Sequence, residues 1–509
     1  MSVIRWVLVV VCLGVSIGLD AELSAQTTFT ESTVLVGSDV GAGHRSAEAV
    51  AFDGDELLFS SVASPFTGDE AAYFFRKIDG VWTEAQKAVS PLIGSCAFGS
   101  VLAIEGGRAV VGDPTQDFTE FCSGHGQFTP FVSQGEGWAE QAPVLGAGSV
   151  RSFGASAAIR GERMLVGAHG QTTSTGVFAS PVVVAFEFDG SSWQQTQVFT
   201  GSDTAIFDRF GNAIAMSADG LTAVIGASKT DLNGALNQAG AAYVFRFDGS
   251  HWIEEQKLVA NDPSSNDEFG YSVAISGDVV TVGAPFDDGA FVRSGSVYEY
   301  RFDGSQWQLS QNFGAGPQSP NGQFGFSLSA DGPLLAVGEP VANKAHIFRD
   351  GGSAYLPLQQ LVSSPGVGNG SLGFSVALSE STCLVGVPFA NVVGFSSGAA
   401  LLFDLQELAL TANATVAAAG DVLTLTTSGG VPGSRCAMIL SPVTQPAGLG
   451  AVGFGAPVIS VGVFGPEGRY TTTRKVPAGF SGGAMGFQVY GQFLPGVVGQ
   501  SNKVAVEVL

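Results

Sequence analysis

Short runs of alternating apolar and polar residues recur along most of the chain, and glycine, aspartate, asparagine or proline separates one run from the next. Alternation with a period of two is typical of β-strands that bury one face, and the separating residues favour turns. The clearest unit starts at Phe269 and reads FGYSVAISGDVVTVGAPFDDGAFVRSGSVYEYRFDGSQWQLSQNF. It predicts four strands: one follows Phe-Gly, one ends in Gly-Ala-Pro, one contains YEYRF, and one starts at a tryptophan.

The four-strand unit repeats about every 50–60 residues, and this internal repetition is the strongest signal in the sequence. A degenerate first copy from His44 keeps two of the strand patterns but lacks the Phe-Gly pair. Because four antiparallel strands form one blade of a β-propeller, seven copies predict an all-β fold with a seven-bladed β-propeller. The anchoring pairs of the other copies are Phe98-Gly99, Phe153-Gly154, Phe210-Gly211, Phe269-Gly270, Phe324-Gly325 and Leu372-Gly373.

A tight turn and an aromatic residue recur between the third and fourth strands. Asp-Gly occupies the turn at residues 79–80, 189–190, 248–249 and 303–304, and this dipeptide accepts the positive φ angles of tight hairpin turns. We interpret the aromatic residue after each turn as packing between blades rather than as a binding platform. These residues are Trp82, Trp138, Trp193, Trp252, Trp307 and Tyr355.

Two folded domains are predicted after the N-terminal segment. The last repeat ends after its third strand, near Leu405, whereas residues 29–36 resemble a fourth strand. We expect this N-terminal strand to complete the last blade beside residues 399–404, so that a propeller over residues 26–406 closes without exposed sheet edges. Residues 407–509 contain short alternating runs and Gly/Pro turns, which predict a small C-terminal β-sandwich-like domain.

Residues 1–25 have the features of a signal peptide. Arg5 precedes an apolar run of about a dozen residues, and small residues surround Ala25. The run is shorter than the roughly 20 residues that cross a bilayer as a helix. We therefore expect a secreted chain with no transmembrane segment after cleavage, located outside the cell or at the cell surface.

Composition and charge narrow the choice of partners. The 509 residues include 45% hydrophobic side chains and carry a formal net charge of −23. A folded core is expected, and nucleic acid is excluded as a partner because the phosphates would be repelled. An extracellular protein or a glycan is the expected partner. Cys96 and Cys122 lie within one repeat, and an oxidising compartment allows them either to form a disulfide or to remain free thiols.

The repeat unit resembles the FG-GAP repeats of bacterial secreted proteins and, more distantly, those of the integrin α-subunit β-propeller. The best copy matches at Phe269-Gly270 and Gly283-Ala284-Pro285, and relaxed forms such as Gly112-Asp113-Pro114 occur in other copies. The resemblance implies a propeller fold and an extracellular location. Integrin-like repeats also hold calcium between their first two strands, but the corresponding turns here are too short and too poor in carboxylates to do so. We expect no cofactor, with calcium elsewhere as the alternative.

Long connections share one predicted face of the propeller, and loops on a rigid scaffold commonly carry binding. Acidic residues gather in these loops. We interpret them as solvated loop residues, and the alternative is a cation site. The candidates for that site are Asp231, Asn233, Asp287 and Asp288.

The five histidines are scattered and HExxH does not occur. G-x-S-x-G is present at residues 394–398 and 479–483, but both copies lie in segments predicted to be all-β, without the helix that follows the serine in a nucleophile elbow. We therefore predict no catalytic and no cofactor-binding residues. The expected function is that of a secreted non-catalytic protein for binding, adhesion or structure that uses the face with the long loops. The alternative is a propeller enzyme that acts on extracellular polysaccharide as a hydrolase or lyase, because its two carboxylates could come from distant loops.

Overall fold

The computed structural model describes residues 31–405 except 63–69, 91–96, 115–125, 147–151, 171–179, 233, 235, 290 and 316–319, and outside this range it describes the strands named below. The chain divides into two compact units, Thr28–Asp404 and a second unit of Met1–Thr27 with Leu405–Leu509. The described elements are strands joined by turns. The prediction of an all-β fold is therefore confirmed for this part of the chain.

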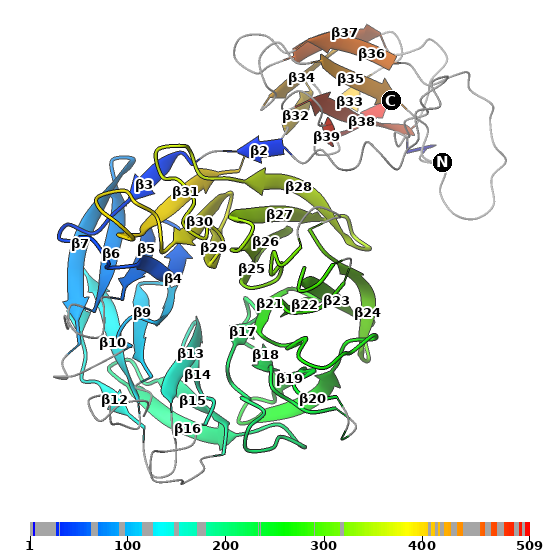
Figure 1. Cartoon of the computed structure of the whole chain (residues 1–509). Helices are drawn as coiled ribbons and strands as arrows, with labels where there is room; N and C mark the ends of the chain where they lie inside the picture. The colour runs from blue at the N-terminus through cyan, green and yellow to red at the C-terminus, as the bar shows by residue number, and fades with distance from the viewer. Residues whose placement is uncertain are drawn as a thin grey trace. The chain divides into compact units, whose positions relative to one another are not determined.

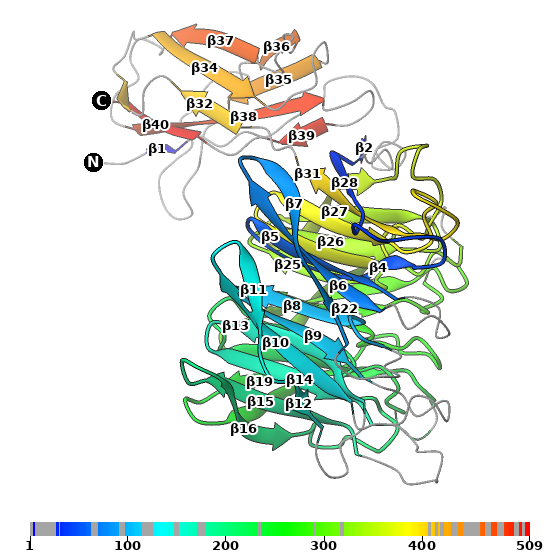
Figure 2. The ribbon, with the colours of Figure 1, turned by 90° about the vertical axis from the view of Figure 1, so that its left-hand side faces the viewer.

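Seven sheets, five with four strands and two with a short fifth strand, form a ring in the first unit, which confirms the seven-bladed propeller (Figure 1). Figure 2 shows the blades from the side. Blade 1 contains β4 (Ser46–Asp53), β5 (Glu56–Ser61), β6 (Ala71–Ile78) and β7 (Val81–Val89). Blade 2 contains β8 (Val101–Glu105), β9 (Arg108–Asp113), β10 (Gln127–Gln134) and β11 (Gly137–Glu140), and β12 (Val144–Leu145) also pairs with β10. Blade 3 contains β13 (Phe153–Arg160), β14 (Arg163–Ala168), β15 (Val182–Phe188) and β16 (Trp193–Phe199). Blade 4 contains β17 (Ile214–Met216), β18 (Thr222–Ala227), β19 (Ala241–Phe247) and β20 (Trp252–Leu258); blade 5 contains β21 (Ser272–Ser276), β22 (Val279–Ala284), β23 (Ser296–Phe302) and β24 (Trp307–Phe313); blade 6 contains β25 (Leu328–Asp331), β26 (Leu334–Glu339), β27 (Lys344–Asp350) and β28 (Tyr355–Leu361); blade 7 contains β29 (Ser375–Ser379), β30 (Thr382–Val387), β31 (Ala399–Asp404) and β3 (Thr33–Leu35).

The outer strand of blade 7 is β3, although β3 precedes blade 1 in the sequence. It runs antiparallel to β31, with Thr33 opposite Leu402 and Leu35 opposite Ala400, which is where the fourth strand was missing from the last repeat. The Leu35 side chain is buried in a core cluster that also contains residues of blade 1. The N-terminal strand therefore joins the first blade to the last. A further short strand, β2 (Thr27–Phe29), pairs with β28.

The Phe-Gly and Gly-Ala-Pro motifs meet where neighbouring blades touch. Gly270 has a φ of +89°, a conformation that glycine adopts without the strain a side chain would add. Its carbonyl oxygen approaches Gly226 of the preceding blade so closely that a Cβ on Gly226 would lie 2.0 Å away. Both glycines are thus required by the contact between two backbones. The same contact joins Gly167 to Gly211, Gly283 to Gly325, Gly338 to Gly373, and Gly386 to Ala47 of the degenerate copy.

A second set of contacts between blades lies at the rim of the ring. Gln197 Oε1 accepts a hydrogen bond from the Trp252 backbone N–H at 2.7 Å, and Gln197 Nε2 donates to the Trp252 carbonyl at 3.0 Å. Gln256 makes the same two contacts with Trp307, each at 2.8 Å. The Trp252 and Trp307 indoles are buried in clusters that draw on two adjacent blades. The role predicted for these tryptophans, packing between blades, is confirmed.

The second unit contains two sheets. One has the order β33-β40-β38-β35-β36, with β1 and β39 also paired to β38, and the other has the order β32-β34-β37. Two sheets within so short a segment fit the β-sandwich-like domain expected there. The strands are β1 (Ile4–Arg5), β32 (Ala409–Ala412), β33 (Val416–Ala417), β34 (Val422–Ser428), β35 (Arg435–Leu440), β36 (Ile459–Val463), β37 (Tyr470–Lys475), β38 (Gly483–Gln492), β39 (Val498–Gln500) and β40 (Val504–Val508).

Candidate functional site

The two faces of the propeller differ in the length of their connections. On one face, tight hairpins join the first strand to the second and the third strand to the fourth. The other face, which we name the loop face, carries the connections from the second strand to the third and from each blade to the next. The connections from second to third strand span residues 228–240 in blade 4, 285–295 in blade 5 and 388–398 in blade 7, but only 340–343 in blade 6.

Several large apolar side chains are exposed on the loop face. Phe395 is 78% exposed, Val292 63% and Phe207 62%. We name six exposed residues of the loop face the apolar tips: Ile206 and Phe207 in the connection from blade 3 to blade 4, Phe291 and Val292 in the blade 5 connection, and Val393 and Phe395 in the blade 7 connection. The sequence shows that these residues lie in loops, but their exposure depends on how each loop folds back on the ring.

The acidic metal candidates act as hydrogen-bond acceptors within their own loops. Asp231 Oδ1 accepts a hydrogen bond from the backbone N–H of Gln238 at 2.7 Å, and Asp288 Oδ1 accepts one from the backbone N–H of Arg293 at 2.9 Å. Asp287 Oδ1 accepts the N–H two residues later at 3.0 Å. Such bonds stabilise turns. Asn233 lies outside the described residues. Within the described residues, no three His, Cys, Asp or Glu side chains gather as a metal site requires.

Negative charge is concentrated on the loop face of blade 5. The Tyr298 hydroxyl lies 2.8 Å from Asp262 Oδ1 and 3.1 Å from Asp287 Oδ2. Burial, together with the charges of Asp287, Asp288 and Asp262, raises the pKa of Asp267 to about 6. Burial and neighbouring negative charge both disfavour the ionised carboxylate. This part of the loop face is therefore strongly acidic at neutral pH.

The innermost strands of the seven blades line a central cavity of about 350 Å³. Polar groups at its hairpin end bond one blade to the next. Asp53 Oδ2 accepts the N–H of Gly106 at 2.7 Å, and Ser379 Oγ accepts the N–H of Gly54 at 2.8 Å. The second of these bonds links blade 7 to blade 1. These polar groups serve the closure of the ring.

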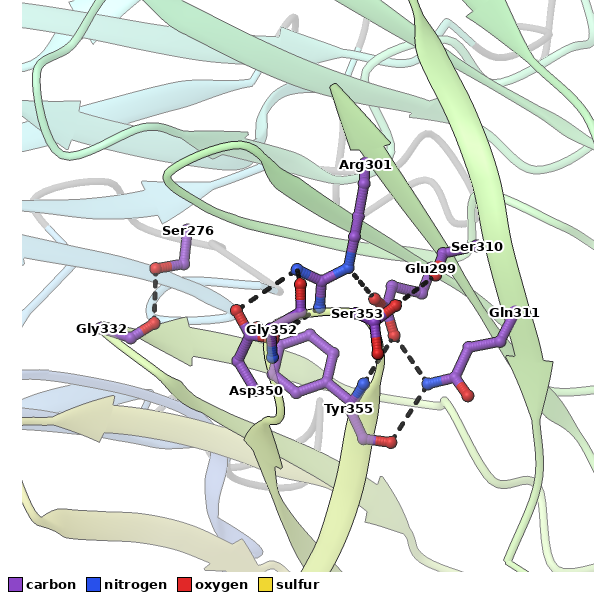
Figure 3. A network of polar contacts seen from close by, with 10 residues as sticks. All are labelled: Ser276, Glu299, Arg301, Ser310, Gln311, Gly332, Asp350, Gly352, Ser353 and Tyr355. Carbon is purple, nitrogen blue, oxygen red and sulfur yellow. Dashed lines mark hydrogen bonds and ion pairs between the residues drawn. The ribbon is translucent and has the colours of Figure 1, made fainter. Parts of the chain in front are cut away.

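A partly buried ion pair network joins blades 5 and 6 (Figure 3). Glu299 on β23 is fully buried, and its carboxylate lies 2.5 Å from Arg301 Nε. It also accepts hydrogen bonds from Gln311 Nε2 at 2.7 Å and from the Tyr355 backbone N–H at 2.9 Å. Arg301 Nη2 reaches Asp350 of blade 6 at 2.6 Å. Half of the rim glutamine contact remains, because Gln311 Nε2 also donates to the Tyr355 carbonyl at 3.1 Å, while Glu299 accepts the Tyr355 N–H in place of the glutamine oxygen. The network has a structural role. No local sequence pattern reveals the network, because its members come from four strands.

Two of the described histidines, His169 and His346, have buried side chains. His346 Nε2 lies 2.7 Å from Glu339 Oε2, and both side chains are buried inside blade 6. The pKa of His169 is lowered to about 4, mainly by burial and also by the positive charge of Arg209. Neither His346 nor His169 lines the central cavity.

Cys383 is the cysteine that lies among the described residues of the propeller. Cys96 and Cys122 lie outside the described residues, so their disulfide stays a prediction. Cys383 is a free thiol buried in β30, and burial raises the pKa of this thiol.

The sequence profile of the FG-GAP repeat matches residues 193–245 and 252–300. Each match runs from a tryptophan strand at the rim into the third strand of the following blade. The two matches contain Gly226 and Gly270, which form one of the contacts between blades described above. The segment of residues 193–300 therefore carries FG-GAP repeats. No curated protein matches the chain.

Three solved structures illustrate what the FG-GAP propeller is similar to. A putative 6-phosphogluconolactonase from Bacteroides uniformis is 12% identical, with 66% of this chain and 91% of that chain covered and a TM-score of 0.43. A fungal alcohol oxidase in complex with copper is 11% identical, with coverages of 94% and 99% and a TM-score of 0.42. The propeller domain of the Trilobed protease from Pyrococcus furiosus is 8% identical, with coverages of 80% and 96% and a TM-score of 0.33. Similarity at this level carries no argument about activity.

Proposed function

We propose that this FG-GAP propeller is a secreted, non-catalytic binding protein that holds an extracellular protein partner on its loop face. The observation that carries the proposal is the exposure of the apolar tips, with Phe395 at 78% and Val292 at 63%. Exposed apolar side chains that share one face can contribute to an interaction surface, because leaving them in water costs free energy that a partner recovers by covering them.

The charge beside the apolar tips indicates the chemistry of the partner. Asp287 and Asp288 lie in the same connection as Phe291 and Val292, and Asp267 adds to the acidic group. Complementary charge favours a partner whose apolar centre is surrounded by lysine and arginine. The net charge of −23 would also steer a basic partner towards the protein at low ionic strength.

Secretion is supported by two observations. Residues 1–25 have the pattern of a signal peptide, and FG-GAP repeats are typical of extracellular proteins. No helix among the described residues is long and apolar enough to span a membrane. Mass spectrometry of the protein from culture medium should find a mature N-terminus near residue 26. Retention inside the cell with residues 1–25 intact would contradict secretion.

The absence of catalysis is tested on mixed extracellular polysaccharides. The purified protein should release no reducing ends or unsaturated sugars above the background of a heat-denatured sample. Turnover that Asp267→Asn or Asp287→Asn abolishes would replace the binding proposal with the enzyme alternative, because both carboxylates belong to the acidic group on the loop face of blade 5.

The binding proposal is tested with the purified mature protein and intact cells from the native source. The double variant Phe291→Ser with Val292→Ser should reduce retention on the cells by about tenfold or more, as expected when central apolar contacts of an interface are removed. Val81→Ser is the matched control, because Val81 is 64% exposed in a hairpin on the opposite face. Equal retention of the double variant and the wild type would refute a role for the apolar tips.

A further inference from the structure

A separate pocket lies on the loop face between blades 6 and 7. Blade 6 has only residues 340–343 between its second and third strands, whereas the matching connection of blade 7 spans 388–398. The short connection leaves a depression of about 630 Å³ beside its longer neighbour. This volume falls within the roughly 300–1,000 Å³ that is typical of small-molecule sites.

One amide side chain holds the walls of this pocket together. Asn343 Oδ1 accepts the backbone N–H groups of Gly370 at 3.1 Å and Leu372 at 2.9 Å. Asn343 Nδ2 lies 3.3 Å from Ser363 Oγ and 3.3 Å from Asn369 Oδ1. Both ends of the amide are thus used to join the blade 6 connection to the segment that leads into blade 7. The shape of the pocket is fixed before any ligand binds, which reduces the entropic cost of binding.

Apolar and polar groups converge on the pocket. Phe389 is 38% exposed and Val341 59% exposed in its lining. Three polar lining groups, the Lys344 ammonium, the Asn369 amide nitrogen and the Ser371 hydroxyl, have no hydrogen bond or ion pair to any other described residue. The lining therefore combines an aromatic wall with several hydrogen-bond donors that a ligand can satisfy.

We propose that this pocket binds a neutral sugar unit of a glycan. The Phe389 ring and Val341 would cover the C–H face of the pyranose ring, and Lys344, Asn369 and Ser371 would hydrogen-bond its hydroxyls. A wholly apolar ligand would bury the three polar groups without partners, which is unfavourable. A polyanionic chain is disfavoured by the net charge of −23. The site is distinct from the apolar tips and does not depend on the protein partner proposed above.

The test uses saturation-transfer difference NMR and titration of the full mature protein with the methyl glycosides of glucose, galactose and mannose, and with glucuronate. At least one neutral glycoside should bind, and Phe389→Ala and Lys344→Met should each weaken that binding by about tenfold, the size expected for a lost ring contact or an unpaired polar group. Phe395→Ala, in the same blade 7 connection, and Lys77→Met, in blade 1, are the matched controls and should bind within twofold of the wild type.

Three results would overturn the proposal: no binding of any neutral glycoside at millimolar concentration, tighter binding of glucuronate than of all neutral glycosides, or unchanged binding by Phe389→Ala and Asn369→Ala. The second of these variants keeps the test valid if Lys344→Met fails to fold. The double variant of Phe291 and Val292 should retain sugar binding. Failure of the protein-binding proposal and failure of the sugar site are therefore separate outcomes.

Discussion

Replacement of Gly283 by alanine tests whether the Gly-Ala-Pro motif exists to let two blades approach. Gly283 lies in β22, and a Cβ there would come within 2.2 Å of the carbonyl oxygen of Gly325 in the next blade. Because real Cβ contacts essentially never fall below 3.0 Å, the backbones must separate by at least about 0.8 Å. The oxygen belongs to the main chain, so rotation of a side chain cannot relieve the clash.

The expected loss of stability follows from this geometry. Overpacking a close contact costs about 1–3 kcal/mol, and a clash between two backbones lies at the upper end. With an unfolding entropy of roughly 2.1 cal/mol/K per residue over the propeller, about 3 kcal/mol corresponds to a Tm lower by about 4 °C. Differential scanning calorimetry of the mature chain measures this shift.

The control is another glycine in a strand. Gly137 lies in β11, and the nearest atom to a Cβ there would be Gln86 Oε1 at 3.8 Å, an ordinary contact. Gly137→Ala should therefore change the Tm by less than about 1 °C. Equal shifts for the two variants, or an unchanged Tm for Gly283→Ala, would refute the explanation of the motif by close approach of the blades.

Three further predictions concern the buried charges, the pH dependence and the closing strand. Arg301→Met leaves the buried Glu299 carboxylate without its cation and should lower the free energy of unfolding in urea by about 3 kcal/mol. The control Arg246→Met breaks a more exposed ion pair with Glu255 and should lower it by less than about 1 kcal/mol. Equal losses would contradict the role of the network. The pKa of His169 is about 4 in the folded state, below the usual 6.5, so between these pH values the unfolded chain binds a proton that the folded chain does not. The free energy of unfolding of the wild type should therefore fall by up to about 3 kcal/mol between pH 6.5 and pH 4 because of this residue. Parallel pH profiles of Tm for the wild type and His169→Gln would rule this out. Leu35→Ala in β3 should lower the free energy of unfolding by about 2–5 kcal/mol, because the Leu35 side chain is 5% exposed in the core. Val34→Ala, at a position that is 38% exposed, should lower it by less than about 1 kcal/mol. Similar losses in thermal or urea unfolding would argue against closure through β3.

The function-related residues were less predictable from the sequence than the fold. Asp287 and Asp288 were visible as acidic loop residues, but the structure shows their carboxylates accepting hydrogen bonds within the loop. The buried Glu299 looked like an ordinary polar residue of an alternating strand. Its burial depends on Arg301 and Asp350, and Asp350 belongs to the next blade. Contacts between residues about 50 positions apart leave no local pattern to read.

The sequence by itself determined the number of blades and the order of their strands. Strand alternation, Asp-Gly turns and paired glycines are local features, and each specifies its own segment of backbone. Counting the strands of each repeat also showed that the last repeat lacks a fourth strand and that residues 29–36 supply one. Only the tertiary structure decided which loop residues stay exposed, why Gly226 and Gly283 must lack a side chain, and where the short connection of blade 6 opens a pocket. These features arise where one blade meets another, and the spacing between blades is a property of the closed ring rather than of any single repeat.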